Sequence, residues 1–181
     1  MREITAADIV SFWRDAGPEK WFEKDDDFDL TIRLRFLPVH EAAARGELAA
    51  FEASAEGALA LVLLFDQFPR NMFRGGARAF ATDPRARAVA NRALARGFDR
   101  LTDAMMRPFF YLPFMHSELI ADQDRCVRLF ETLGDAEQLA YAHRHRDIVA
   151  RFGRFPHRND TLGRDTTPAE REFLGSGGFK G

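Results

Sequence analysis

The stretch that decides the fold is "GALALVLLFDQFPRNMFRG", residues 57–75. It contains the longest apolar run of the chain, "ALALVLLF" at residues 58–65, whose apolar side chains surround a helix on every side. A helix that is apolar all round is buried, and eight residues are far short of the roughly 20 needed to span a bilayer. The stretch therefore predicts a central core helix that begins after a cap at Ser54 and ends at Pro69, because proline cannot continue a helix.

Outward from this stretch the apolar spacing is helical almost throughout, and no convincing alternating strand is found. We expect Thr5 and Asp8 to form a capping box and Pro38 to kink or split the helix that contains it. We also expect a side chain of the Thr-Asp-Pro at 82–84 to cap one later helix and Ser117 to cap another. Further helices are expected at 136–152 and after the Thr-Thr-Pro at 166–168. The helix from the Ser117 cap to Gly134 and the helix at 136–152 are expected to form an antiparallel hairpin.

These elements predict an all-α fold of about seven to nine helices, with hairpins packed as in tetratricopeptide repeats. No exact repeat period is found, so a regular repeat array is not expected. At 181 residues the chain suits one compact domain, which we place at residues 1–174, followed by a flexible tail at 175–181.

Composition limits the class of protein. The net charge of −2 argues against a globally basic nucleic-acid binder, and the first ten residues lack the apolar core of a signal peptide. The single cysteine, Cys126, has no partner for an internal disulfide, which favours a reducing compartment. We therefore expect a cytoplasmic protein that binds neither nucleic acid nor membrane. A protein partner and a homo-oligomer stay open.

A short phrase near the start of the chain recurs near its end. "FDQFPRNMF" at 65–73 is matched 87 residues later by "FGRFPHRND" at 152–160, with His157 inserted. In both copies the proline is expected to end a helix, while the preceding phenylalanine anchors the exit in the core. The simplest interpretation is that the same structural motif ends a helix in both copies, with the arginine donating hydrogen bonds to the carbonyls at the helix end.

A functional interpretation is that the two Phe-Pro segments, each at the end of a helix, place their arginines in one shared cleft. Residues 143–164 carry six arginines and three histidines against two aspartates, and planar arginine forks suit phosphate and carboxylate groups. This favours a binding module for an anionic small molecule or a peptide carboxylate. The candidate ligand-binding residues are Arg70, Asn71, Arg154, His157, Arg158 and Asn159.

Two alternatives stay open. One is an acid–base or metal-assisted hydrolase with His116 or His157 acting together with Asp66 or Glu118. The other is a protein-interaction scaffold whose motifs are purely structural, with Asp66 and Arg158 as a buried salt bridge. The acidic Asp66 precedes the first Phe-Pro, where it opposes the helix dipole, so an arginine partner such as Arg70 or Arg158 is expected. The sequence predicts no cofactor and no metal site, and whether the protein is an enzyme stays open.

Several long motifs, "GALALVLLFDQFPRNMFRG", "RAFATDP", "FFYLPFMHSE", "HRDIVARFGRFPHRN" and "LGRDTTPAE", occur together and in this order. In this respect the chain resembles the bacterial family known as domain of unknown function 924, over roughly residues 9–174. The resemblance implies a tetratricopeptide-like helical fold and supplies no established catalytic residues. The motif positions that match are Asp66, Gln67, Arg70, Asn71, His116, Glu118, Asp122, His145, Arg146, Asp147, Arg154, His157, Arg158 and Asn159. Pro38 departs from the family pattern of an unbroken helix.

Overall fold

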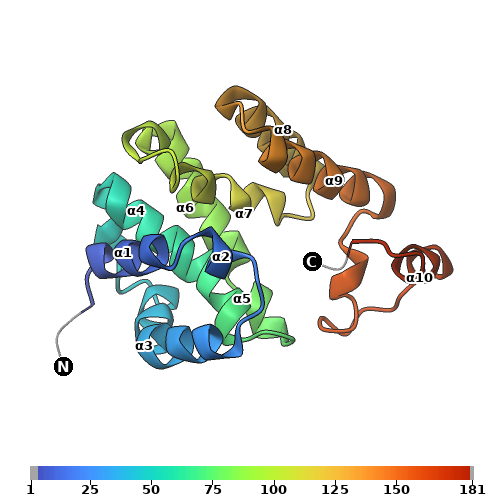
Figure 1. The fold of residues 1–181 in the computed structure, drawn as a ribbon, viewed down its shortest axis with the longest axis horizontal. Helices are drawn as coiled ribbons and strands as arrows, with labels where there is room; N and C mark the ends of the chain where they lie inside the picture. Colours follow the sequence, from blue (N-terminus) through green and yellow to red (C-terminus); the bar gives the residue numbers. More distant parts are fainter. Residues whose placement is uncertain (1–3, 180–181) are drawn as a thin grey trace. The chain divides into compact units, whose positions relative to one another are not determined.

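The computed structural model describes residues 4–179, and all regular structure in that range is helical (Figure 1). The all-α prediction is confirmed. Seven helices in the described range have eight or more residues: α1 (Ala6–Ala16), α3 (Asp26–Ala44), α4 (Ala55–Val62), α6 (Asp83–Ala95), α8 (Ile120–Leu133), α9 (Ala136–Phe152) and α10 (Pro168–Gly175). The shorter ones are α2 (Pro18–Trp21), α5 (Phe68–Met72) and α7 (Leu112–Met115). One π-helical segment, η2 (Leu63–Gln67), joins α4 to α5, and five 3₁₀ segments complete the set: η1 (Ala49–Ala53), η3 (Ala77–Phe80), η4 (Phe98–Leu101), η5 (Arg107–Phe110) and η6 (Pro156–Arg158).

The chain divides into two compact units. Unit 1 comprises Met1–Arg74 and Arg78–Pro113, and unit 2 comprises Gly75–Ala77 and Phe114–Gly181. The first Phe-Pro segment lies in unit 1 and the second in unit 2. That the two units form one domain over residues 1–174 stays a prediction of the sequence.

The centre of unit 1 is α4, as its all-round apolar sequence predicts. Every residue from Gly57 to Val62 is buried, and α4 packs against α1 and α6. Ser54 caps the helix by accepting a hydrogen bond from the Gly57 N–H at 3.0 Å. A Cβ at Gly57 would lie 2.0 Å from the Phe51 carbonyl oxygen, so only glycine allows η1 to lie this close to α4.

An aromatic cluster fills the rest of the unit 1 core. Trp13 of α1 and Phe36 of α3 are fully buried and both contact Phe68, with ring centroids 5.5 and 4.8 Å apart. Phe12 and Phe28, which are only partly buried, form the outer layer of this cluster, stacked at 5.6 Å. The cluster thus joins α1, α3 and α5 and leaves two phenylalanine rings partly exposed.

The prediction that the core helix ends at Pro69 is wrong. The helix continues through η2 and α5 to Met72, and the Phe68 N–H bonds to the Leu63 carbonyl, one residue further back than in an α-helix. Pro69 has no N–H for the Phe65 carbonyl and its ring would clash with that group in an ordinary α-helix. The wider π turn accommodates the ring, and the Thr82 hydroxyl donates to the Phe65 carbonyl at 2.7 Å in place of the missing N–H.

Three further local predictions are corrected. Thr82 does not cap α6, because its hydroxyl is used at Phe65. Pro38 does not split α3, which runs unbroken to Ala44, and a kink there stays a prediction. Leu34, whose carbonyl loses its N–H donor, lies on the exposed side where water can replace it. Ser117 does not cap α8, which begins at Ile120; its hydroxyl instead donates to Asp122 at 2.6 Å.

In unit 2 the predicted antiparallel hairpin is confirmed. Helices α8 and α9 lie side by side (Figure 1), and their join at Gly134 has the left-handed φ of 76° that favours glycine. The Thr5–Asp8 capping box in unit 1 is likewise confirmed, and so is the helix expected after the Thr-Thr-Pro at 166–168, which is α10.

Helix α10 ends at Gly175, and the Phe179 ring further on contacts the His145 ring at a centroid distance of 4.6 Å. Residues 180–181 of the predicted flexible tail lie outside the described range, and the boundary of that tail stays a prediction. None of the helices within residues 4–179 combines the length and the apolar character that crossing a membrane requires.

Candidate functional site

The second Phe-Pro segment follows the end of α9 and does not itself end that helix. Gly153, with φ of 70°, closes α9 three residues before Pro156. Phe155 is fully buried, as predicted for an anchor, and Pro156, His157 and Arg158 form the short segment η6. The anchor therefore fixes where η6 leaves the core and where His157 lies.

The residues on either side of η6 are held to α10 by a carboxylate. Both oxygens of the buried Glu170 accept from Arg154, at 2.7 and 2.9 Å, and Glu170 Oε2 also accepts from the Thr167 N–H at 2.8 Å. Asn159, which is fully buried, donates to the same oxygen at 3.2 Å. The hydrogen bond from Arg154 lowers the pKa of Glu170 to about 2, so this carboxylate is charged at neutral pH.

A second carboxylate fixes the other side of the loop. Glu118 accepts both a bidentate pair from Arg164, at 2.7 and 3.0 Å, and the Phe155 N–H at 2.7 Å. Burial raises the pKa of Glu118, but the hydrogen bonds from Arg164 and Phe155 outweigh it, and the net shift is downward. Glu118 is therefore a carboxylate that already accepts three hydrogen bonds, an arrangement suited to anchoring a loop.

Three basic side chains lie around the Phe155 anchor. Arg158 is buried, donates to the His116 carbonyl at 3.1 Å, and lies 4.6 Å from the Phe155 ring centroid. His145 is buried beside the same ring, its Nδ1 2.8 Å from the Tyr141 carbonyl oxygen. Burial lowers the pKa of His145 to about 4 and, with Arg158 nearby, that of His157 to about 4. Both imidazoles are therefore neutral at pH 7.

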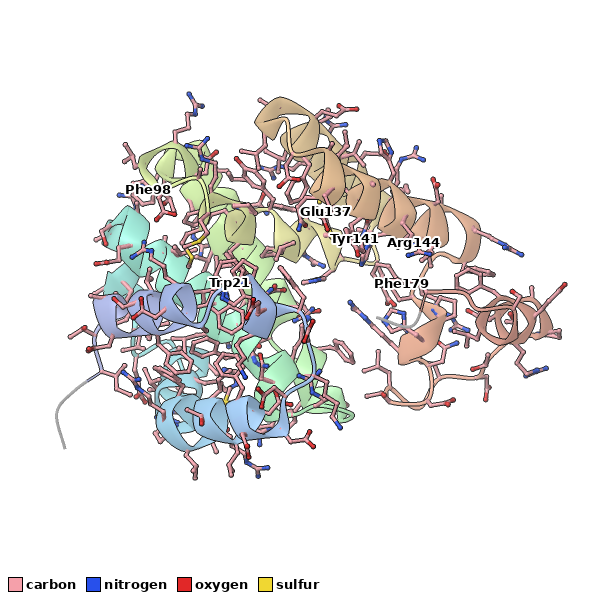
Figure 2. All side chains as sticks on the ribbon, in the orientation of Figure 1. Trp21, Phe98, Glu137, Tyr141, Arg144 and Phe179 are labelled. Carbon is pink, nitrogen blue, oxygen red and sulfur yellow. The ribbon has the colours of Figure 1, made fainter. Side chains whose placement is uncertain are left out.

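Phe179 covers one side of these imidazoles. Its ring contacts both His145 and His157, and Arg144 of α9 lies 5.7 Å from its centroid (Figure 2). This ring shields the two histidines from water, which contributes to the burial that lowers their pKa values.

The other side of His157 borders a surface depression of about 510 Å³ that lies within unit 2. The His157 Nδ1 atom is buried and has no hydrogen-bond partner among residues 4–179. Arg171 of α10 lies in the same lining and is exposed; the hydrogen bond that it donates goes to the Thr166 carbonyl, which is uncharged. The full lining is Pro156, His157, Asp160, Arg164, Asp165, Thr166, Arg171 and Leu174.

The first Phe-Pro segment, in unit 1, is occupied by internal partners. Arg70 makes a bidentate pair with Asp83 at 3.0 and 3.1 Å, lies 3.4 Å from the buried Asp66 carboxylate, and donates to the Asp66 carbonyl. Asn71 donates to Asp29 at 2.7 Å. The expected arginine partner of Asp66 is therefore found in Arg70, which also contacts a helix carbonyl, as the structural interpretation predicts.

The predicted site residues thus fall into two groups. Asp66, Arg70 and Asn71 lie in unit 1, whereas His116, Glu118, Arg154, His157, Arg158 and Asn159 lie in unit 2. A cleft shared by the arginines of the two Phe-Pro segments stays a prediction.

Sequence reasoning did not single out Arg171, Leu174 or Glu170 as site residues. For Glu170 a signal existed, because the Thr-x-x-Glu spacing from Thr167 is that of a capping box. Arg171 and Leu174 had no such signal: they reach the depression only because Arg154 and Asn159 hold α10 against the loop. Within the described residues, no group of three or more histidine, cysteine, aspartate or glutamate side chains is arranged to hold a metal ion.

Comparison with known proteins agrees with the architecture. The model of a family described as "Bacterial protein of unknown function (DUF924)" matches residues 9–178. A solved structure, that of a protein of unknown function, ATU0120, from Agrobacterium tumefaciens, is 54% identical with a TM-score of 0.92, covering 94% of this chain and 97% of that chain. A search of curated proteins finds no match.

Proposed function

The chain belongs to the DUF924 family of bacterial proteins of unknown function, and we propose that it is a binding module whose unit 2 depression takes a small molecule with a single carboxylate group. The observation that carries the proposal is His157, whose buried Nδ1 atom has no hydrogen-bond partner among residues 4–179 and which lines a depression that also contains Arg171. Buried polar atoms are rarely left without a partner, so this atom is a natural point of attachment for a ligand.

The charge of the lining narrows the ligand class. Arg171 supplies guanidinium donors that face no carboxylate partner in the described residues, and His157, neutral at pH 7, supplies an imidazole N–H in one tautomer. Asp160 and Asp165 lie in the same lining and would repel a multiply charged anion. A monoanion is therefore the expected ligand, in preference to a nucleoside triphosphate or a nucleic acid.

The site is built to hold its shape before the ligand arrives. Arg154 and Glu170 lock α10 to the loop, and Arg164 and Glu118 lock the loop to the segment before α8. Preorganisation of this kind reduces the loss of conformational freedom on binding. Arg154, Arg158 and Asn159 act in this proposal as supports of the site, and His157 contacts the ligand.

The proposal also includes tetratricopeptide-like packing, supported by the α8–α9 hairpin, and a cytoplasmic location, supported by a single buried cysteine. The hydrolase alternative gains no support from Glu118, whose oxygens accept three hydrogen bonds from within the chain.

The test is a thermal-shift and calorimetric screen of phosphate, short monocarboxylates and nucleotides at pH 7. We expect a monoanion to stabilise the wild type, and Arg171→Gln to weaken its binding about tenfold, as the loss of a charged hydrogen-bond donor does. Arg128→Gln is the matched control, since Arg128 is exposed on α8 of the same unit and outside the lining. The proposal fails if no monoanion binds, or if the two variants weaken binding equally.

A further inference from the structure

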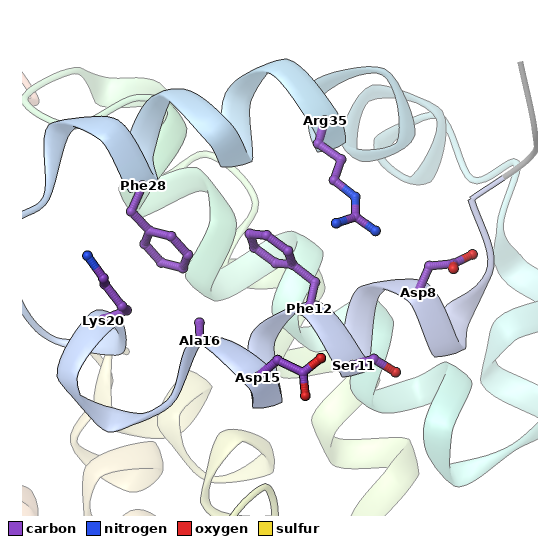
Figure 3. A pocket seen from close by; sticks show the side chains of 8 residues that line it. All are labelled: Asp8, Ser11, Phe12, Asp15, Ala16, Lys20, Phe28 and Arg35. Atoms are coloured by element: carbon purple, nitrogen blue, oxygen red, sulfur yellow. The ribbon is translucent and has the colours of Figure 1, made fainter.

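A second hollow lies in unit 1, unrelated to the proposed function. It has a volume of about 470 Å³ and is lined by residues of α1, α2 and α3: Asp8, Ser11, Phe12, Asp15, Ala16, Lys20, Phe28 and Arg35 (Figure 3). Its lining combines an apolar base with charges of both signs, which distinguishes it from an ordinary gap between surface helices.

The base of the hollow consists of two phenylalanine rings. Phe12 and Phe28 are nearly parallel, with an interplanar angle of 9° and centroids 5.6 Å apart, and both remain partly exposed. Their inner sides rest on the buried rings of Phe36 and Trp13. A rigid pair of parallel, partly exposed rings is a surface on which a third aromatic ring packs favourably.

The positive charge comes from α3. The Arg35 guanidinium lies over this base, 5.1 Å from the Phe12 centroid and 5.0 Å from that of Phe36. Stacking on the two rings holds the guanidinium in place, and no carboxylate pairs with it among residues 4–179. Lys20, by contrast, is bound to Asp25. Arg35 is therefore the cation that is ready to bind a carboxylate.

The negative charge comes from α1. Asp15 is exposed one helical turn after Phe12 and has no hydrogen-bonded or ionic partner in the described range, while Asp8 is engaged in the capping box with Thr5. Figure 3 shows Asp15 on the α1 side and Arg35 on the α3 side, with Phe12 between them. A ligand on the two rings thus has a cation on one side and a carboxylate on the other.

From this arrangement we propose that the hollow binds an aromatic α-amino acid. The ligand ring packs on Phe12 and Phe28, its carboxylate accepts from Arg35, and its ammonium group donates to Asp15. Charge complementarity selects a zwitterion, because a simple anion faces Asp15 and a simple amine faces Arg35.

Titration calorimetry with L-phenylalanine tests the proposal, with three probes that each lack one feature: 3-phenylpropionate without the ammonium, phenethylamine without the carboxylate, and L-alanine without the ring. We expect each probe to bind at least about tenfold more weakly than phenylalanine. Arg35→Gln should abolish the preference over phenethylamine, and Asp15→Asn the preference over 3-phenylpropionate. Arg33→Gln, an exposed arginine of α3 outside the lining, should change neither.

Because 3-phenylpropionate is also a monoanion, the titrations are repeated in Arg171→Gln, which removes the cation proposed for unit 2. Binding of phenylalanine that survives Arg171→Gln but not Arg35→Gln supports the unit 1 site whatever happens at the other. Binding no tighter than that of the three probes, or equal loss in Arg35→Gln and Arg33→Gln, overturns the inference.

Discussion

At the scale of single residues, the arginines of the doubled phrase differ from the expectation of a basic cleft. Arg70 and Arg154 each face a carboxylate of the same chain in a bidentate pair, a geometry that uses the guanidinium fork for internal contacts. The histidines differ in another way: His145 and His157 are desolvated and neutral, and His157 lines the unit 2 depression. Whether a basic side chain can bind a ligand therefore depends on which of its atoms already have partners, more than on the number of basic residues nearby.

The buried histidines make stability depend on pH. The pKa of His145 is about 4 in the folded chain against an ordinary value of about 6.5, so between these values the unfolded chain binds more protons. The stabilisation is complete above pH 6.5 and is lost as pH falls toward 4. We expect His145→Phe to reduce the slope of unfolding free energy against pH in this window by on the order of 1 kcal/mol per pH unit.

Urea unfolding at pH 4.5, 5.5, 6.5 and 7.5 measures this slope for the wild type and the variant. His143→Gln serves as control, because His143 is exposed on the same helix and should leave the slope unchanged. A slope for His145→Phe equal to that of the wild type would contradict the assignment of a neutral, buried imidazole.

At the scale of elements, the π segment before Pro69 explains how a proline lies inside a core helix. The wider turn changes the hydrogen bonding of two successive carbonyls: that of Leu64 lies 2.8 Å from His40 Nδ1, and that of Phe65 accepts from Thr82. Side chains from α3 and from the start of α6 thus take the place of helix N–H donors. Tertiary contacts, and not helix propensity, hold this element together.

Thr82→Val tests this account. The variant keeps the shape of the side chain and removes the hydroxyl, leaving the buried Phe65 carbonyl without that donor. We expect the free energy of unfolding to fall by about 1–3 kcal/mol, measured by urea denaturation. Thr82→Ser, which restores the hydroxyl, should lose less, and equal stability of Thr82→Val and the wild type would mean that the hydrogen bond contributes nothing.

At the scale of the whole molecule, the open question is whether the two units unfold together. Both tryptophans, Trp13 and Trp21, lie in unit 1, whereas the Arg154–Glu170 pair lies in unit 2. Tryptophan fluorescence therefore reports on one unit alone, while far-UV circular dichroism reports on the helices of both. A variant confined to unit 2 can separate cooperative from independent unfolding.

Glu170→Gln is that variant. It removes the charge that Arg154 pairs with and should cost about 2–4 kcal/mol. If residues 1–174 form one domain, as the sequence predicts, the fluorescence and dichroism transitions in urea should shift together and by the same amount. Glu172→Gln, an exposed carboxylate of the same helix, should shift neither. A fluorescence transition that stays at its wild-type position would show independent units.

The sequence by itself determined the helical class, a central core helix that begins after a cap at Ser54, the α8–α9 hairpin and the phenylalanine anchors. These follow from apolar spacing, glycine positions and capping residues, which act between near neighbours along the chain. It also identified a basic region at residues 143–164. What it could not determine was whether those arginines were available, since that depends on carboxylates such as Glu170 and Glu118 that no spacing rule pairs with them.

Only the tertiary structure decided which groups form hydrogen bonds with one another. Local rules placed a helix end at Pro69 and a cap at Thr82. The structure replaces both with one hydrogen bond, in which the Thr82 hydroxyl donates to the Phe65 carbonyl that Pro69 leaves without an N–H donor. In the same way, burial and not residue type set the charge state of His145 and left His157 Nδ1 without a partner among the described residues. Hydrogen bonding and desolvation depend on which groups meet in space, and the order of residues along the chain does not specify those meetings.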